Sequence, residues 1–245
     1  MEPWEYDSAQ DIDRNVIERL RQFPREPDML VYGARLAAML LLRTGLRLYH
    51  RFKILGRENL PREGSFVLVA NHASHLDVMC LISAFPLRKV HRVFPAAAQD
   101  YFFVSVPRLA IAAIVVNALP FDRQVSIRHS LGLCQRLLEN PGNVLVIFPE
   151  GTRSISGELC EFKPGIGLLV AGKDVPVVPC YLEGAHRAWG KGHRLPKPHR
   201  VRLTIGAARN YSQLKPGKES ALHIAEDLRS AVLALASSAE ASKKI

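Results

Sequence analysis

Short apolar runs that alternate with helical stretches constrain the fold of this chain most strongly. The strand-like runs are FVLVA at 66–70, VFPAA at 93–97, VLVIFP at 144–149, VPVVPCYL at 175–182 and VRLTI at 201–205. Between them lie segments whose apolar positions recur at helical spacing. This alternation predicts an α/β domain with a central, mostly parallel or mixed sheet that is largely buried and flanked by helices.

Three further segments are predicted to be helices between or after the strands. They are LDVMCLISAF at 76–85, SIRHSLGLCQRLLE at 126–139 and KESALHIAEDLRSAVLALA at 218–236. Ser126 is a plausible N-cap for the second of these helices. FKPGIGLL at 162–169 lacks the third glycine of a dinucleotide loop, so we interpret it as the start of a helix.

The N-terminal region is expected to form amphipathic helices. Residues 1–28 are polar and end in a proline-containing turn, which predicts a short surface helix. In the apolar segment 29–52, Arg43, Arg47 and Arg51 recur every four residues and would form one basic stripe on a helix. Such a helix could lie on an acidic bilayer surface or could cap the domain as an ordinary core helix.

A second apolar stretch, at 101–120, also leaves two interpretations open. Its sequence is YFFVSVPRLAIAAIVVNALP, which is apolar apart from Arg108. It is either a buried element or a wall that faces lipid. Together with the basic charge, the two stretches favour a peripheral or monotopic membrane protein at the cytoplasmic face of a membrane.

Length and composition predict one domain with appendages. The chain has 245 residues, of which 48% are hydrophobic, enough for a sizeable core. We expect a helical membrane-associating segment at 1–50, the α/β domain at 51–215, and a C-terminal helix and tail at 216–245. The four cysteines lie far apart without a C-x-x-C pair, which indicates reduced thiols in the cytosol.

The charge of the chain favours anionic partners. Lys and Arg number 33 against 23 Asp and Glu, a formal charge of +10. Phosphates, acidic lipid headgroups and nucleic acid all fit such a charge. The segment HRAWGKGHRLPKPHR at 186–200 is interpreted as a solvated basic loop rather than a nucleic-acid site, because no recognised module accompanies it.

The first polar cluster, NHASHLD at 71–77, follows the predicted strand at 66–70. If His72 lies in the loop and Asp77 in the first helical turn, the carboxylate could hold one ring nitrogen while the other takes a proton from a hydroxyl. A metal site formed by His72, His75 and Asp77, and a polar loop with ordinary capping, are the alternatives.

The second polar cluster, FPEGTRS at 148–154, follows the predicted strand at 144–149. Gly151 permits an unusual backbone turn, and Arg153 offers a planar fork suited to phosphate oxygens. The alternative is a simple turn with a surface pair of Glu150 and Arg153. Because both clusters lie at strand ends, they are predicted to form one site.

Together the two clusters resemble a known family. The pattern N-H-x-S-x-x-D, formed by Asn71, His72, Ser74 and Asp77, and F-P-E-G-T-R-S about 70 residues later resemble the PlsC-like glycerolipid acyltransferases. The 1-acylglycerol-3-phosphate acyltransferases are especially similar. Lesser matches are FDR at 121–123 and VPVVPCYLEG at 175–184.

The resemblance implies transfer of a fatty acyl group from acyl-CoA or acyl carrier protein to the hydroxyl of a lysolipid. The expected acceptor is 1-acyl-sn-glycerol 3-phosphate, which would give phosphatidic acid, and neither a cofactor nor a metal is implied. His72 would be the general base and Asp77 would orient it. The residues implied to bind the acceptor, with the arginines on its phosphate, are Arg123, Glu150, Gly151, Thr152 and Arg153.

Departures from the family pattern keep other acceptors open. Where many relatives carry a lysine and Glu-Leu, this chain has AAAQDYFF at 96–103. Another lysolipid or a hydroxylated lipid is therefore an alternative acceptor. A non-catalytic lipid-binding protein and a basic nucleic-acid-binding protein are the alternatives from other functional classes.

Overall fold

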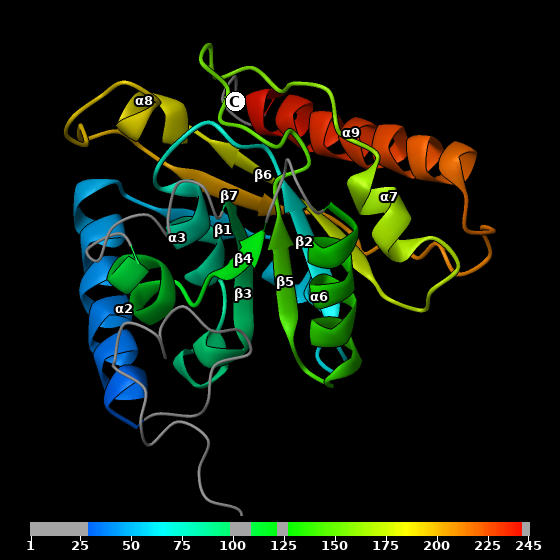
Figure 1. Cartoon of the computed structure of the whole chain (residues 1–245). Coiled ribbons are helices and arrows are strands. Elements are labelled where there is room, and N and C mark those ends of the chain that lie inside the picture. The colour runs from blue at the N-terminus through cyan, green and yellow to red at the C-terminus, as the bar shows by residue number, and fades with distance from the viewer. Residues whose placement is uncertain (1–28, 99–108, 122–126, 242–245) are drawn as a thin grey trace, which may run out of the picture.

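A seven-stranded mixed sheet forms the centre of the computed structural model, which describes residues 29–98, 109–121 and 127–241 (Figure 1). The strand order is β1-β7-β6-β2-β5-β3-β4. All neighbouring strands run parallel except β6 and β7, which are antiparallel. The strands are β1 (Lys53–Leu55), β2 (Phe66–Ala70), β3 (Val93–Ala98), β4 (Leu119–Phe121), β5 (Val144–Ile147), β6 (Val177–Glu183) and β7 (Arg202–Ile205).

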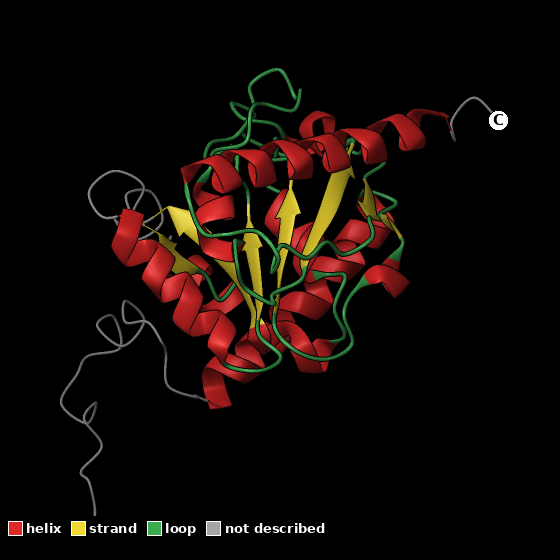
Figure 2. Cartoon of the chain, turned by 90° about the vertical axis from the view of Figure 1, so that its right-hand side faces the viewer, coloured by secondary structure: helices red, strands yellow, loops and turns green. Residues whose placement is uncertain are grey.

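Helices cover both faces of this sheet (Figure 2). The α-helices are α2 (Met29–Tyr49), α3 (Asp77–Ile82), α6 (Ile127–Glu139), α7 (Gly165–Val170), α8 (Ala185–Trp189) and α9 (Lys218–Ala241). Two 3₁₀ segments, η1 (Arg57–Asn59) and η2 (Leu87–Arg92), and one π-helical segment, η3 (Ile111–Val115), complete the described elements. The predicted α/β class with a mixed sheet and flanking helices is confirmed.

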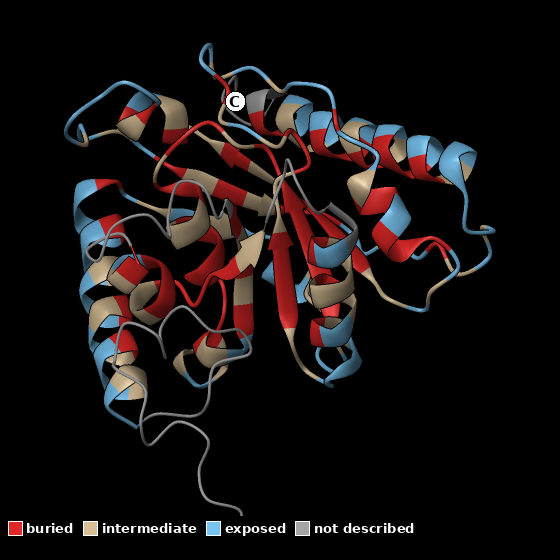
Figure 3. Ribbon diagram, viewed as in Figure 1, coloured by how far each residue is buried: buried red, intermediate tan, exposed pale blue. Residues whose placement is uncertain are grey.

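The central strand β2 separates two hydrophobic clusters. All five of its residues are buried, as a parallel strand covered on both faces requires. Phe66, Leu68 and Ala70 point to the cluster that holds α2 and α3, whereas Val67 and Val69 point to the cluster of α6, α7 and α9. Figure 3 shows the buried strands between helices whose outer faces are exposed.

Helix α2 is oriented differently from the sequence prediction. Arg35 is buried, and its guanidinium donates to the carbonyl oxygens of Ile114 and Ala113 at 2.8 Å each and to Asn117 Oδ1 at 3.1 Å. Burial lowers the pKa of Arg35 to about 10. Arg43 also turns inward and donates to a backbone carbonyl oxygen, that of Phe85.

The predicted stripe of Arg43, Arg47 and Arg51 is therefore wrong. Helix α2 ends at Tyr49, because the carbonyl of Leu46 accepts the N–H groups of both His50 and Phe52 as the chain leaves the helix. Arg51 lies beyond this end with φ 46° and is not helical. Of the three arginines, Arg43 faces the protein and Arg47 faces solvent.

An apolar stripe occupies the outward face of α2 instead. Leu30, Leu41 and Leu48 are 84%, 76% and 74% exposed, and the exposed Ala34 and Ala37 lie on the same face. Within the described residues, α2 is the one helix whose length and apolar composition would allow it to cross a membrane.

Most of the described part of the second apolar stretch is buried or partly buried, although Ile111 is 48% exposed. Leu109, Ala112 and Ala113 have at most 1% of their surface exposed, and η3 packs against α2. The first part of the stretch, up to residue 108, lies outside the described residues, as do the predicted surface helix within residues 1–28 and the predicted N-cap Ser126.

Candidate active site

The two polar clusters lie side by side at one edge of the sheet. They follow β2 and β5, which are parallel neighbours paired at Val69 and Ile147. The backbones of the two loops are bonded directly: the N–H of Ser154 donates to the carbonyl oxygen of His72 at 2.7 Å. The prediction that both clusters occupy one place in the fold is confirmed by this register.

His72 and Asp77 form a hydrogen-bonded pair. Nδ1 of His72 lies 2.9 Å from Oδ2 of Asp77, and the same oxygen accepts the N–H groups of Ala73 and Ser74 at 2.7 Å each. Asp77 is fully buried and is the first residue of α3. Because a carboxylate with three donors is a strong acceptor, it fixes the tautomer of His72 with its proton on Nδ1 and a lone pair on Nε2.

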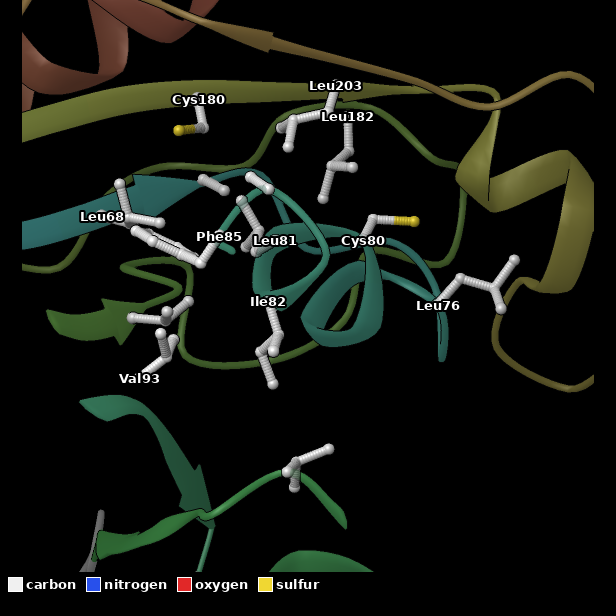
Figure 4. Close-up of a cluster of buried hydrophobic side chains, with 14 of the residues drawn as sticks. Leu68, Leu76, Cys80, Leu81, Ile82, Phe85, Val93, Cys180, Leu182 and Leu203 are labelled. Atoms are coloured by element: carbon white, nitrogen blue, oxygen red, sulfur yellow. The ribbon is translucent and has the colours of Figure 1, made fainter. Parts of the chain in front are cut away.

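The surroundings hold the imidazole in place while leaving it accessible. The ring of His72 stacks on Phe148 with a centroid separation of 4.1 Å, and 21% of the side chain is exposed. Helix α3, which carries Asp77, packs through residues such as Cys80 and Leu81 into the buried cluster shown in Figure 4. A rigid core element therefore supports the carboxylate.

Glu150 clamps the loop that carries His72. It is 4% exposed, and its Oε1 accepts the N–H of His72 at 2.7 Å while its Oε2 accepts the N–H of Cys160 at 3.1 Å. Both carboxylate oxygens thus bind backbone donors. The hydrogen bond to Glu150 raises the pKa of the exposed Cys160 thiol, so this cysteine has no activated thiolate.

Two cationic side chains belong to the surroundings of Gly151: Lys163 lies against its turn, and Arg153 follows two residues later. This glycine has φ 72°, and a side chain added to it would meet Nζ of Lys163 at 2.9 Å, so the ammonium group lies against the turn. Arg153 places Nη1 2.8 Å from Nδ1 and 2.5 Å from Nε2 of His75. Thr152 is exposed. Lys163, Arg153 and exposed donors make this turn suitable for an anion.

The ring of His75 is hydrogen-bonded to Arg153 and is not part of the pair of His72 and Asp77. Burial, followed by the positive charge of Arg153, lowers the pKa of His75, so its ring is neutral and accepts from the guanidinium. The ring also packs on Trp189, with centroids 5.0 Å apart. In the described part of the chain, no group of three or more His, Cys, Asp or Glu residues is arranged to hold a metal ion.

Two sets of contacts in the site were not predicted from the sequence. The carbonyl oxygen of Trp189, in α8, accepts the Ser74 hydroxyl at 2.8 Å and the His75 N–H at 3.1 Å. The amide of Asn71 joins β2 to the backbone of Leu182 in β6. The tryptophan within 186–200 was the available signal, but that segment was interpreted as a loop; its first residues are helical.

Arg123, the remaining residue expected to bind the acceptor, lies outside the described residues. Strand β4 ends at Phe121, two positions before it. Its predicted role stays a prediction.

Comparison with known proteins identifies the family. The sequence model of the family described as Acyltransferase matches residues 51–183, more than half of the chain. The chain belongs to the acyltransferase family. Both clusters of the site lie within the matched span.

Relatives of this acyltransferase include plant and bacterial proteins. A chloroplastic 1-acyl-sn-glycerol-3-phosphate acyltransferase, BAT2 of Brassica napus, is 31% identical over 153 residues, covering 59% of this chain and 40% of that protein. A probable 1-acyl-sn-glycerol-3-phosphate acyltransferase of Mycoplasma pneumoniae is 28% identical over 185 residues, covering 72% and 62%. The chain thus spans 40 to 62% of the length of these two relatives.

A solved structure shares the fold of this acyltransferase. The crystal structure of the 1-acyl-sn-glycerophosphate acyltransferase PlsC from Thermotoga maritima aligns with a TM-score of 0.61 and 22% identity. The alignment covers 81% of this chain and 78% of that one. At this identity the similarity describes the architecture.

Proposed function

We propose that this acyltransferase moves a fatty acyl group from a thioester to the hydroxyl of a lysolipid, with 1-acyl-sn-glycerol 3-phosphate as the acceptor. The observation that carries the proposal is the hydrogen-bonded pair of His72 and Asp77 beside a cationic turn. The printed names of the relatives support this acceptor. The product would be phosphatidic acid.

The geometry supports general-base catalysis by His72. Asp77 holds Nδ1–H, so Nε2 takes the proton of the acceptor hydroxyl as its oxygen attacks the thioester carbonyl. When the tetrahedral intermediate collapses, the carbon–sulfur bond breaks and the proton on Nε2 passes to the leaving thiolate. Asp77 stabilises the transient imidazolium and keeps the ring oriented.

The acceptor phosphate is proposed to bind at the turn of Gly151. Arg153 and Lys163 supply positive charge there, and Thr152 supplies a hydroxyl donor. We retain Arg123 as a further phosphate ligand on the strength of the sequence pattern. Glu150 acts as a positioning residue, because both of its oxygens hold backbone N–H groups.

We also propose that α2 attaches the enzyme to the cytosolic face of a membrane. Its outward leucines form a continuous apolar face, while Arg35 and Arg43 bind the protein from the inner side. The buried thiols of Cys80, Cys134 and Cys180 fit a reducing compartment.

The His72→Ala variant tests the catalytic proposal. We expect kcat to fall by about 10²–10⁴-fold, because the general base is lost. His223→Ala, at an exposed position on α9, is the matched control and should retain full activity. Products from labelled acyl donors and a panel of lysolipids would be identified by mass. A folded His72→Ala enzyme with full turnover would overturn the mechanism, and a lipid-binding role without catalysis would then stand.

Sedimentation with vesicles tests the membrane proposal. Leu41→Glu and Leu48→Glu should abolish co-sedimentation with vesicles of phosphatidylcholine and phosphatidylglycerol, because each places a charge on the apolar face. Leu222→Glu, at a half-exposed leucine on α9, is the control. If all three variants bind vesicles like the parent protein, α2 is not the attachment surface.

A further inference from the structure

A cavity of about 970 Å³ opens beside the catalytic pair. Its walls are the end of β6, helix α8, the segment leading into β7, the start of β1 and the turn at 156–158. Ala73 also lines it, and the N–H of Ala73 is bonded to the carboxylate of Asp77. The cavity therefore reaches the loop that carries His72.

Positive charge converges on this cavity from distant parts of the chain. Five Arg or Lys side chains and two His line it, against two Glu. The five are Arg51, Lys53, Arg187, Arg200 and Arg202. Parallel pairing of β1 with β7 places Lys53 opposite Arg202, so the first and last strands bring their cations together.

The two acidic residues do not neutralise the cations. Glu183 lies 3.7 Å from Arg202, which offsets one charge on each side. Glu158 is then the one remaining acidic side chain in the lining against four remaining Arg or Lys side chains, of which Arg51, Lys53 and Arg187 are exposed to solvent. Cations gathered around a concave surface raise the local concentration of anions and favour a polyanionic ligand.

The walls of the cavity are closely packed. A side chain added to Gly184, at φ 78°, would collide with the carbonyl oxygen of Arg200. One added to Gly157, at φ 86°, would meet the ring of His186, whose Nε2 is bonded to the carbonyl oxygen of Ile155 at 2.9 Å. The concave shape is thus fixed by backbone contacts rather than by surface side chains alone.

This site is distinct from the turn assigned to the acceptor phosphate. Neither Arg153 nor Lys163 lines the cavity, and none of its cations lies in the loop 148–154. The structure thus holds two cationic places around one catalytic pair. A reaction between a phosphorylated lipid and a thioester needs a place for each substrate.

We propose that the cavity binds the phosphates of the 3′-phosphoadenosine diphosphate of acyl-coenzyme A. This inference rests on the proposed acyl transfer and selects the donor class. The volume is at the upper end of the range for small-molecule sites, about 300–1,000 Å³. A nucleotide can enter such a concavity, whereas an acidic carrier protein would dock on its rim. The pantetheine arm passes Ala73 to bring the thioester to His72.

Substitutions at two exposed cavity arginines test the assignment. Arg187→Ala and Arg200→Ala should each raise KM for acyl-coenzyme A about tenfold, as expected for the loss of a charged hydrogen bond. KM for acyl-pantetheine, which has the same thioester without the nucleotide, should change far less. Arg194→Ala is the matched control, because Arg194 is exposed in the same segment but does not line the cavity.

A binding measurement separates this inference from the proposed function. Calorimetry with adenosine 3′,5′-bisphosphate should show binding to the parent enzyme and loss of binding in the double variant of Arg187 and Arg200. If that pattern holds while no acyl transfer occurs, the nucleotide site stands and the proposed function fails. Equal acyl-coenzyme A KM values in parent and variants would overturn the nucleotide site. So would a rise in KM confined to acyl carrier protein, which would assign the cations to an acidic protein.

Discussion

The loop after β2 and the loop after β5 leave the same edge of the sheet, yet they are built differently. In the first loop, the buried carboxylate of Asp77 accepts from His72, Ala73 and Ser74 of its own segment. In the second loop, the buried carboxylate of Glu150 instead accepts from His72 in the neighbouring loop. Thr152 and Arg153 of this loop are the side chains proposed to bind the acceptor phosphate. We infer that the first loop sets turnover and the second sets acceptor affinity.

The largest expected effect comes from breaking the first loop. Asp77→Asn should lower kcat by about 10³–10⁴-fold, because an amide can donate to Nδ1 and so favours the wrong tautomer of His72. KM for the acceptor should change little. Asp174→Asn, at an exposed position, is the control. Steady-state kinetics measure both constants, and a loss below tenfold would remove Asp77 from the mechanism.

The next effect tests the contact between the loops. Glu150→Ala should lower kcat by about 10–100-fold, because the N–H groups of His72 and Cys160 lose their acceptor, at a cost of about 1–3 kcal/mol for each buried group. Glu150→Gln keeps one oxygen acceptor and should lose less. A change confined to acceptor KM would instead make Glu150 a ligand of the acceptor, and the proposed contrast between the loops would fail.

The third effect concerns the second loop alone. Arg153→Ala should raise acceptor KM by about 10–100-fold with a smaller change in kcat, because a charge-assisted hydrogen bond to phosphate is lost. Arg153→Lys should recover part of the affinity, since it keeps the charge without the planar fork. Titration of the acceptor at saturating donor measures both constants. An unchanged KM would contradict the phosphate assignment.

The smallest effect is on stability, at the point where the two loops meet. The pKa of His75 lies below its ordinary value of 6.5 because of burial and Arg153, so the unfolded chain binds this proton more readily. Stability from this group is present above about pH 6.5 and is lost as the pH falls through the lowered pKa.

Urea unfolding at pH 7 and pH 5 measures this effect. The parent should lose a few tenths of a kcal/mol more than His75→Gln on acidification, a small value because solvent screens a half-exposed ring. Equal losses in both proteins would show that His75 does not titrate differently in the two states. His91 remains in both, so its lowered pKa cancels in the comparison.

The sequence predicted the central strands of the sheet, but not the two outermost strands, β1 and β4. β2 and β5 are buried on both faces, so their apolar runs are distinct in the sequence. β1 and β4 have three residues each, too few for a periodic pattern, and they were not predicted. Helix α9 was predicted from its periodicity but extends to Ala241, beyond the expected residue 236.

The orientation of α2 was missed for a different reason. A four-residue spacing of arginines puts them on one helix face but does not say which way that face points. Leucines occupy the opposite face of α2, so both faces are compatible with burial in the sequence pattern. Arg35 and Arg43 face the protein because they donate to the backbone carbonyl oxygens of Ala113, Ile114 and Phe85. The sequence does not indicate which backbone carbonyl groups will be available as acceptors.

Local spacing predicted the hydrogen-bonded pair of His72 and Asp77, whereas long-range contacts in the site could not be predicted. His72 and Asp77 are five residues apart, and a strand end followed by a helix start brings them together. Glu150 lies 78 positions from His72, and the Trp189 carbonyl lies 115 positions from Ser74. Those contacts depend on the order of the strands in the sheet.

The short step from α2 to β1 has a consequence for how the enzyme would sit on a bilayer. The helix ends at Tyr49, and Lys53 is already hydrogen-bonded into the sheet through the carbonyl oxygen of Val201. Nothing between them is long enough to act as a tether. If α2 lies on a bilayer as proposed, the rigid body of the protein would set the height of the imidazole above the lipid headgroups, and an acceptor would have to rise to that fixed level to react.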